Sequence, residues 1–97
     1  MLRHVVVFRF PSDTSDASLD ELRAALLALP DQVPEIRALS AGTDLRMRDG
    51  NGDFAVVADF DDADGFRAFL ANPQYARVMA ELIMPHIESR HAVQLSV

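Results

Sequence analysis

His4 and Tyr75 are the side chains whose types and positions best suit acid–base chemistry. His4 could act as a general base, because the usual pKa of histidine is close to neutrality. The Tyr75 hydroxyl could donate a hydrogen bond to a developing oxyanion. Each also has a structural interpretation: His4 as a core histidine bonded to a backbone carbonyl or to Tyr75, and Tyr75 as a large side chain that fills the core. The residues alone leave both interpretations open.

Other chemistries find little support. His86 and His91 are not part of an HxxxH or HxxE pattern, so a dedicated metal site is not expected. The acidic run at residues 59, 61, 62 and 64 suits a solvated helix start better than a cation site. The chain has no cysteine, which excludes thiolate catalysis and disulfides. We therefore predict no dedicated metal site and no cofactor, and the residues leave incidental Mg²⁺ binding open.

The charge excludes two classes of partner. A formal net charge of −6 argues against nucleic acid, which demands a basic face, and against anionic membrane surfaces. No apolar run reaches the 18 or so residues of a membrane span. The opening "MLRHVVVFRF" has too short an apolar stretch for a signal peptide. The expected location is the cytoplasm.

The segment that carries His4 reads as a strand over residues 2–10. Its period of two sends His4, Val6 and Phe8 to one face and Val5 and Val7 to the other. Apolar residues on both faces indicate that both are covered.

The next apolar pattern is helical. Four leucines at helical spacing form its buried stripe, Ser18 and Glu21 fit a capping box at its start, and Pro30 breaks it. Further on, Phe66, Phe69 and Leu70 mark the apolar side of a short helix.

A third helix carries Tyr75. Asn72 suits its N-cap and Pro73 its first position. Pro85 should kink or end it. Its apolar face is expected to hold Tyr75, Met79, Leu82, Ile83 and His86.

Three more strands are predicted, at 36–45, 54–60 and 91–97, with a hairpin loop at 46–53 marked by Asp-Gly and Asn-Gly steps. The order of elements gives an α+β fold: a single ferredoxin-like βαββαβ domain over residues 1–97, with a four-stranded antiparallel sheet and helices on one face. The other face, with Val5, Val7, Ala55 and Val57, would need a cover. A second copy of the chain could supply it.

Four segments together carry a family resemblance: "LRHVVVFRF", "ALPDQVPEIRALSAGTDL", "DFAVVADFDDADGFRAFLANPQYARV" and "HAVQLSV". They resemble the stress-responsive A/B barrel domain (Dabb) family. The resemblance implies a homodimer in which two ferredoxin-like sheets close into an α+β barrel. It also implies a pocket between sheet and helices, where a polyketide cyclase of the family uses a histidine and a tyrosine.

The match of site residues to that cyclase is partial. His4 matches a pocket histidine of the cyclase. In the family pattern Tyr-x-x-His-Pro-x-His, Phe69 stands for the tyrosine, Asn72 for the first histidine and Tyr75 for the second, so the dyad is absent. Gln94 stands near a pocket acid, which is lost.

We therefore predict a homodimer that binds a small apolar or aromatic molecule. The alternative is a cyclase-like enzyme with His4 as base and Tyr75 as oxyanion donor. The residues predicted to line the pocket are Val6, Phe8, Phe54, Val56, Phe69, Met79 and Gln94.

Overall fold

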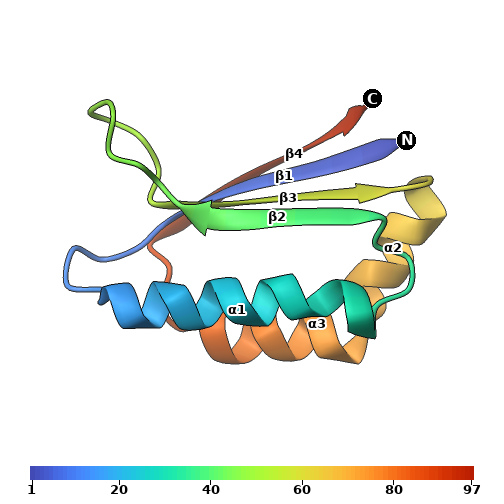
Figure 1. Cartoon of the computed structure of the whole chain (residues 1–97), viewed down its shortest axis with the longest axis horizontal. Helices are drawn as coiled ribbons and strands as arrows, with labels where there is room; N and C mark the ends of the chain where they lie inside the picture. Colours follow the sequence, from blue (N-terminus) through green and yellow to red (C-terminus); the bar gives the residue numbers. More distant parts are fainter.

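The computed structural model describes all 97 residues. Four strands form one sheet, and the helices lie against one side of it (Figure 1). The elements are β1 (Leu2–Arg9), α1 (Asp16–Gln32), β2 (Ala38–Thr43), β3 (Phe54–Phe60), α2 (Ala63–Ala71), α3 (Pro73–Val78), the π-helical turn η1 (Met79–Ile83) and β4 (Ser89–Ser96). None of the helices combines the length and the apolar character needed to cross a membrane.

The sheet has the strand order β2-β3-β1-β4, and every neighbouring pair is antiparallel. His4 of β1 lies opposite Ala58 of β3 on one side and Gln94 of β4 on the other. The predicted ferredoxin-like α+β fold is confirmed. The two central strands place His4 near the middle of the helix-covered face.

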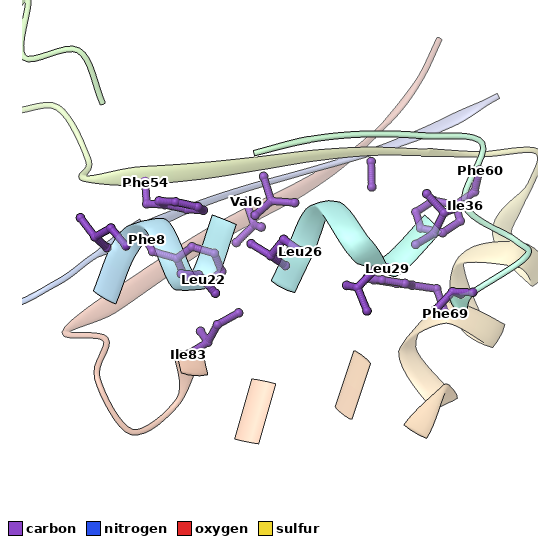
Figure 2. Close-up of a cluster of buried hydrophobic side chains, with 14 of the residues drawn as sticks. Val6, Phe8, Leu22, Leu26, Leu29, Ile36, Phe54, Phe60, Phe69 and Ile83 are labelled. Carbon is purple, nitrogen blue, oxygen red and sulfur yellow. The ribbon is translucent and has the colours of Figure 1, made fainter. Parts of the chain in front are cut away.

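The hydrophobic core fills the space between this face and the helices (Figure 2). It forms because alternate strand residues face α1, which contributes a leucine at each turn. The buried apolar residues are Val6, Phe8, Phe10, Leu19, Leu22, Leu26, Leu29, Val33, Ile36, Phe54, Val56, Ala58, Phe60, Phe69 and Ile83.

Both predicted ends of the first helix were wrong. The N-cap is Ser15 rather than Ser18: its hydroxyl accepts a hydrogen bond from the Ser18 backbone N–H at 3.1 Å. At the other end, the helix continues past Pro30 to Gln32. Leu29 and Val33 are fully buried, and the Val33 N–H donates to the Leu29 carbonyl at 2.8 Å. Burial of these two side chains holds the last turn despite the proline.

The junction between α2 and α3 was predicted correctly. The Asn72 side chain accepts a hydrogen bond from the Gln74 N–H at 2.8 Å, and Pro73 occupies the first helical position. The Asn72 N–H also closes α2 by donating to the Phe69 carbonyl. One residue thus ends one helix and begins the next.

Helix α3 continues into η1, where the Met84 N–H donates to the Met79 carbonyl five residues back at 2.8 Å. The wider turn places Ile83 in the core at 1% exposure. The helical segment ends before Pro85, as expected. Of the predicted apolar face, His86 is exposed and lies outside the helix.

Strand bounds differ at the ends. β3 spans Phe54–Phe60 as predicted, whereas β2 is shorter than 36–45 because its ladder to β3 covers only residues 38–43. β4 begins at Ser89 rather than His91, because Ser89 pairs with Arg9 of β1. β1 correspondingly ends at Arg9.

The second face of the sheet has no helix over it (Figure 1). A row of small and apolar residues crosses its middle, namely Ser40, Val57, Val5 and Val93. Arg3 and Asp59 pair across β1 and β3 with contacts of 2.8 and 3.0 Å. On β4, Val93 is 49% and Leu95 46% exposed. We call this surface the open face.

Candidate functional site

His4 is a buried polar residue on the helix side of the sheet, with only 4% of its surface exposed. Its ring lies against two aromatic side chains of α2. The ring centroids are 5.0 Å from Phe66 and 6.3 Å from Phe69. Strand alternation therefore directs His4 toward the helices, as its sequence predicted.

The polar partner of His4 is Gln94. The side-chain Nε2 of Gln94 lies 3.0 Å from Nδ1 of His4. In this orientation the amide donates to Nδ1, so a neutral imidazole carries its proton on Nε2. If the carboxamide turns over, its oxygen accepts the Nδ1 proton and Nε2 becomes a free base. Gln94 thus controls which chemistry His4 can offer.

The second ring nitrogen of His4 is free. Nε2 makes no hydrogen bond within the chain. The one fully enclosed side-chain nitrogen or oxygen without a partner is Oε2 of Glu35. Nε2 of His4 is therefore not fully enclosed, although the residue as a whole is only 4% exposed.

Tyr75 lies in the first turn of α3, and its ring centroid is 4.1 Å from that of Phe69. Phe69 thus contacts both His4 and Tyr75. The Tyr75 hydroxyl makes no hydrogen bond within the chain and, like Nε2 of His4, is not fully enclosed. We call His4, Phe66, Phe69, Tyr75 and Gln94 the aromatic site.

The environment keeps both titratable groups of the aromatic site neutral at pH 7. Burial lowers the pKa of His4, and the positive charge of Arg90 lowers it further. Burial raises the pKa of Tyr75, an effect that the Arg90 charge partly offsets. Tyr75 is therefore a hydrogen-bond donor and His4 an uncharged ring. The catalytic hypothesis requires His4 to titrate close to neutrality. Burial works against this, because it lowers the pKa of His4.

The predicted pocket residues take different places. Phe69 and Gln94 contact His4, and Met79 is partly buried against the core. Val6, Phe8, Phe54 and Val56 are buried in the hydrophobic core. Ligand contact by these four residues stays a prediction.

Five hollows of the surface have other linings: neither His4 nor Tyr75 lines any of them. Gln94 lines one of these hollows, which has a volume of about 360 Å³. Its other lining residues include Leu2, Asp61, Asp62 and Ser96. The aromatic site therefore adjoins a hollow through Gln94, but is not itself a deep cavity.

The side chains of the acidic run at residues 61, 62 and 64 form ion pairs and a helix cap. Asp61 pairs with Arg37 at 2.8 Å, and Asp62 caps α2 by accepting from the Gly65 N–H at 2.9 Å. Asp64 pairs with Arg67. No group of three or more histidine, aspartate or glutamate side chains is placed to hold a metal ion.

Sequence reasoning missed that Phe66 packs on His4 and that the charge of Arg90 acts on it. Phe66 was assigned only to the apolar side of its helix, which gives no hint of the strand residue it touches. Arg90 fell just outside the predicted last strand, so its facing was not considered. The pairing of β4 with β1 from Ser89 onward is what brings Arg90 onto the helix side, opposite Phe8.

Comparisons with known proteins agree with this fold. The family model of the "Stress responsive A/B Barrel Domain" matches residues 2–97. A dimeric ferredoxin-like protein of unknown function from Thermobifida fusca is 38% identical, with a TM-score of 0.90, over 99% of this chain and 90% of that one. No protein with a curated function matches the sequence.

Two enzymes share the fold at lower identity. The hydroxynitrile lyase from Passiflora edulis is 24% identical with a TM-score of 0.86, over 99% of this chain and 92% of that one. The cofactor-independent oxygenase SnoaB from Streptomyces nogalater is 20% identical with a TM-score of 0.75, over 99% and 91%. At these identities the likeness concerns the fold alone.

Proposed function

The chain belongs to the stress-responsive A/B barrel domain family, and we propose that it is a homodimer that binds a small aromatic or apolar molecule at the aromatic site. The observation that carries the proposal is a pair of unpartnered polar groups, Nε2 of His4 and the Tyr75 hydroxyl, on two side chains whose rings both lie close to Phe69. A planar ligand would stack against the phenylalanines, and an oxygen on it would accept hydrogen bonds from the two polar groups.

The open face supports the dimer. Its valines are left uncovered by the helices of their own chain, and large exposed apolar patches typically mark interaction sites. The relative from Thermobifida fusca is described as dimeric. A second copy packed sheet to sheet would cover both faces at once. The interface should bury more than about 1,000 Å² in total.

Ligand binding is tested by NMR with neutral aromatic probes such as phenol, acetophenone and 4-hydroxybenzamide. We expect saturable shift changes at His4, Phe66 and Tyr75 with at least one probe. The Tyr75→Phe variant, which keeps the ring and removes the hydroxyl, should bind more weakly. The NMR signal of Leu27, which is exposed on α1, serves as the reference that should not shift. Absence of saturable shifts with every probe, or shifts centred on another surface, would overturn the proposal.

The second candidate is an enzyme of the proton-transfer type. The rotation open to the Gln94 carboxamide favours it, because the turned amide leaves Nε2 of His4 as a base. That base would take a proton from a carbon next to a carbonyl group, and Tyr75 would donate a hydrogen bond to the enolate oxygen. The imidazolium then exchanges its proton with solvent and returns one to the carbon, which completes the exchange.

Deuterium exchange tests this alternative. Acetophenone in D₂O should exchange its methyl hydrogens faster with the protein than without it, and the rate should fall in His4→Gln. Equal rates for the two proteins exclude His4 as the base. Binding without exchange leaves the first proposal as the better one.

A further inference from the structure

Arg90 differs from most arginines of this chain because it has no partner. All nine basic residues are arginine: six donate hydrogen bonds to a carboxylate or a backbone carbonyl, Arg77 forms an ion pair with Glu81 at 3.7 Å, and only Arg48 and Arg90 have neither kind of partner. Arg48 lies in the exposed hairpin loop between β2 and β3. Arg90 lies in β4, on the same strand as Gln94.

The strand register places Arg90 on the helix side of the sheet, which is also the side of the aromatic site. Arg90 pairs with Phe8 and Gln94 with His4, so both lie on the helix side of β4, with Ala92 between them. All three are exposed although they face the helix layer, so the helices stop short of this edge strand. Between Arg90 and Gln94 only the methyl group of Ala92 projects. The edge of the sheet therefore forms an open shelf beside the aromatic site, with a cation at one end.

The charge of Arg90 reaches both polar groups of the aromatic site. It is the one charged side chain that lowers the pKa of His4 and also that of Tyr75. Two groups on different elements, β1 and α3, thus feel the same guanidinium. This shared effect agrees with the pairing of β4 with β1, which puts Arg90 on the helix side of the sheet.

We propose that Arg90 binds the carboxylate of an aromatic or cyclic acid whose ring lies against Phe66 and Phe69. This inference rests on the proposed binding function of the aromatic site and specifies the ligand class. A guanidinium is suited to a carboxylate because it can donate two parallel hydrogen bonds. In a chain with a net charge of −6, most of the surface repels anions. A single unpaired arginine beside the site then decides whether an acid or its neutral analogue binds.

The test compares two probes of the same shape, 4-hydroxybenzoate and 4-hydroxybenzamide, by NMR titration at low salt. Wild type should bind the acid at least about tenfold more tightly, a difference worth about 1.4 kcal/mol. Arg90→Gln should remove this preference and leave the amide affinity within about twofold. Arg48→Gln, which removes the other unpaired arginine, is the matched control and should behave as wild type.

The outcomes separate this inference from the proposed function. If wild type binds the amide as tightly as the acid, or if Arg90→Gln retains the preference, Arg90 is not the selecting residue and the binding function stands. If neither these two probes nor any neutral probe binds at the aromatic site, both proposals fail together. Loss of amide binding in Arg90→Gln with a native spectrum would also contradict the inference, because it would show a role unrelated to charge.

Discussion

Nε2 of the Gln94 side chain lies 3.0 Å from Nδ1 of His4, across the pairing of β4 with β1. The amide is the only hydrogen-bonding partner of a buried imidazole, and an amide can present either a donor or an acceptor to it. The protonation of His4 is therefore open to change by one substitution at position 94.

We predict that Gln94→Glu raises the pKa of His4. A carboxylate at this position would accept the Nδ1 proton and stabilise the imidazolium, whereas the amide adds no charge. The measurement is an NMR titration of the His4 ring in both proteins, with Gln32→Glu as a control for added charge at an exposed position. An unchanged His4 pKa would show that the contact is not formed in solution.

The low pKa of His4 should make the fold sensitive to mild acid. The unfolded chain binds a proton at His4 at a higher pH than the folded chain does. Protonation therefore favours unfolding, and the free energy of unfolding should fall as the pH drops below about 6.5. Urea unfolding at pH 7.5 and 5.5 measures this. His4→Gln should show a smaller difference between the two pH values than wild type.

Removal of the Tyr75 hydroxyl should leave stability almost unchanged. The hydroxyl has no partner in the chain, so Tyr75→Phe keeps the packing on Phe69 and loses no internal hydrogen bond. The free energy of unfolding should change by less than about 0.5 kcal/mol. A loss of more than about 1 kcal/mol would mean that the hydroxyl is bonded after all. It would then be part of the core rather than of a binding site.

Loss of the Asn72 cap should cost stability. Asn72→Ala removes the acceptor of the Gln74 N–H, and the free energy of unfolding should fall by about 1 kcal/mol. Thermal or urea unfolding measures the change, and Gln74→Ala, which keeps the capping side chain, is the control. Equal midpoints for Asn72→Ala and wild type would argue against the cap.

A charge at the centre of the open face should dissociate the proposed dimer. Val57 lies between Ser40 and Val5 on this face, and a lysine there would be buried without a partner in a sheet-to-sheet interface, at a cost of several kcal/mol. Light scattering should return a dimer mass for wild type and a monomer mass for Val57→Lys. Leu27→Lys, on the outer side of α1, should stay dimeric. A monomeric wild type at micromolar concentration would refute the dimer.

The fold could be predicted because its signals are local. Strand alternation gave the facing of His4, and Asn-Pro placed the junction of α2 and α3 at the correct residue. The start of α1 was missed because "SDAS" contains two serines, Ser15 and Ser18, and either could be the N-cap. The sequence does not say which hydroxyl accepts the hydrogen bond from the first helical turn. Pro30 was misread because the burial of Leu29 and Val33, a tertiary effect, outweighs a local break.

The site was harder to predict than the fold. His4 and Tyr75 could be named from residue type, and Gln94 from family resemblance. That Phe69 contacts both rings, and that Arg90 acts on both, depends on how β4 pairs with β1 and how α2 crosses the sheet. Such contacts join residues far apart in the chain. No periodicity within one segment reports them.

The π turn at Met79–Ile83 has a consequence for chain length. A π turn holds one residue more than the α-helical turn it replaces. Deleting Ala80, which is exposed, would let the helix close with ordinary spacing while Tyr75 on one side and Ile83 on the other keep their facing. An insertion or deletion of a single codon elsewhere in a helix rotates everything that follows by about 100°. This turn is therefore the point in the helical segment at which the chain can lose one residue while Tyr75 keeps its direction toward Phe69 and Ile83 stays in the core.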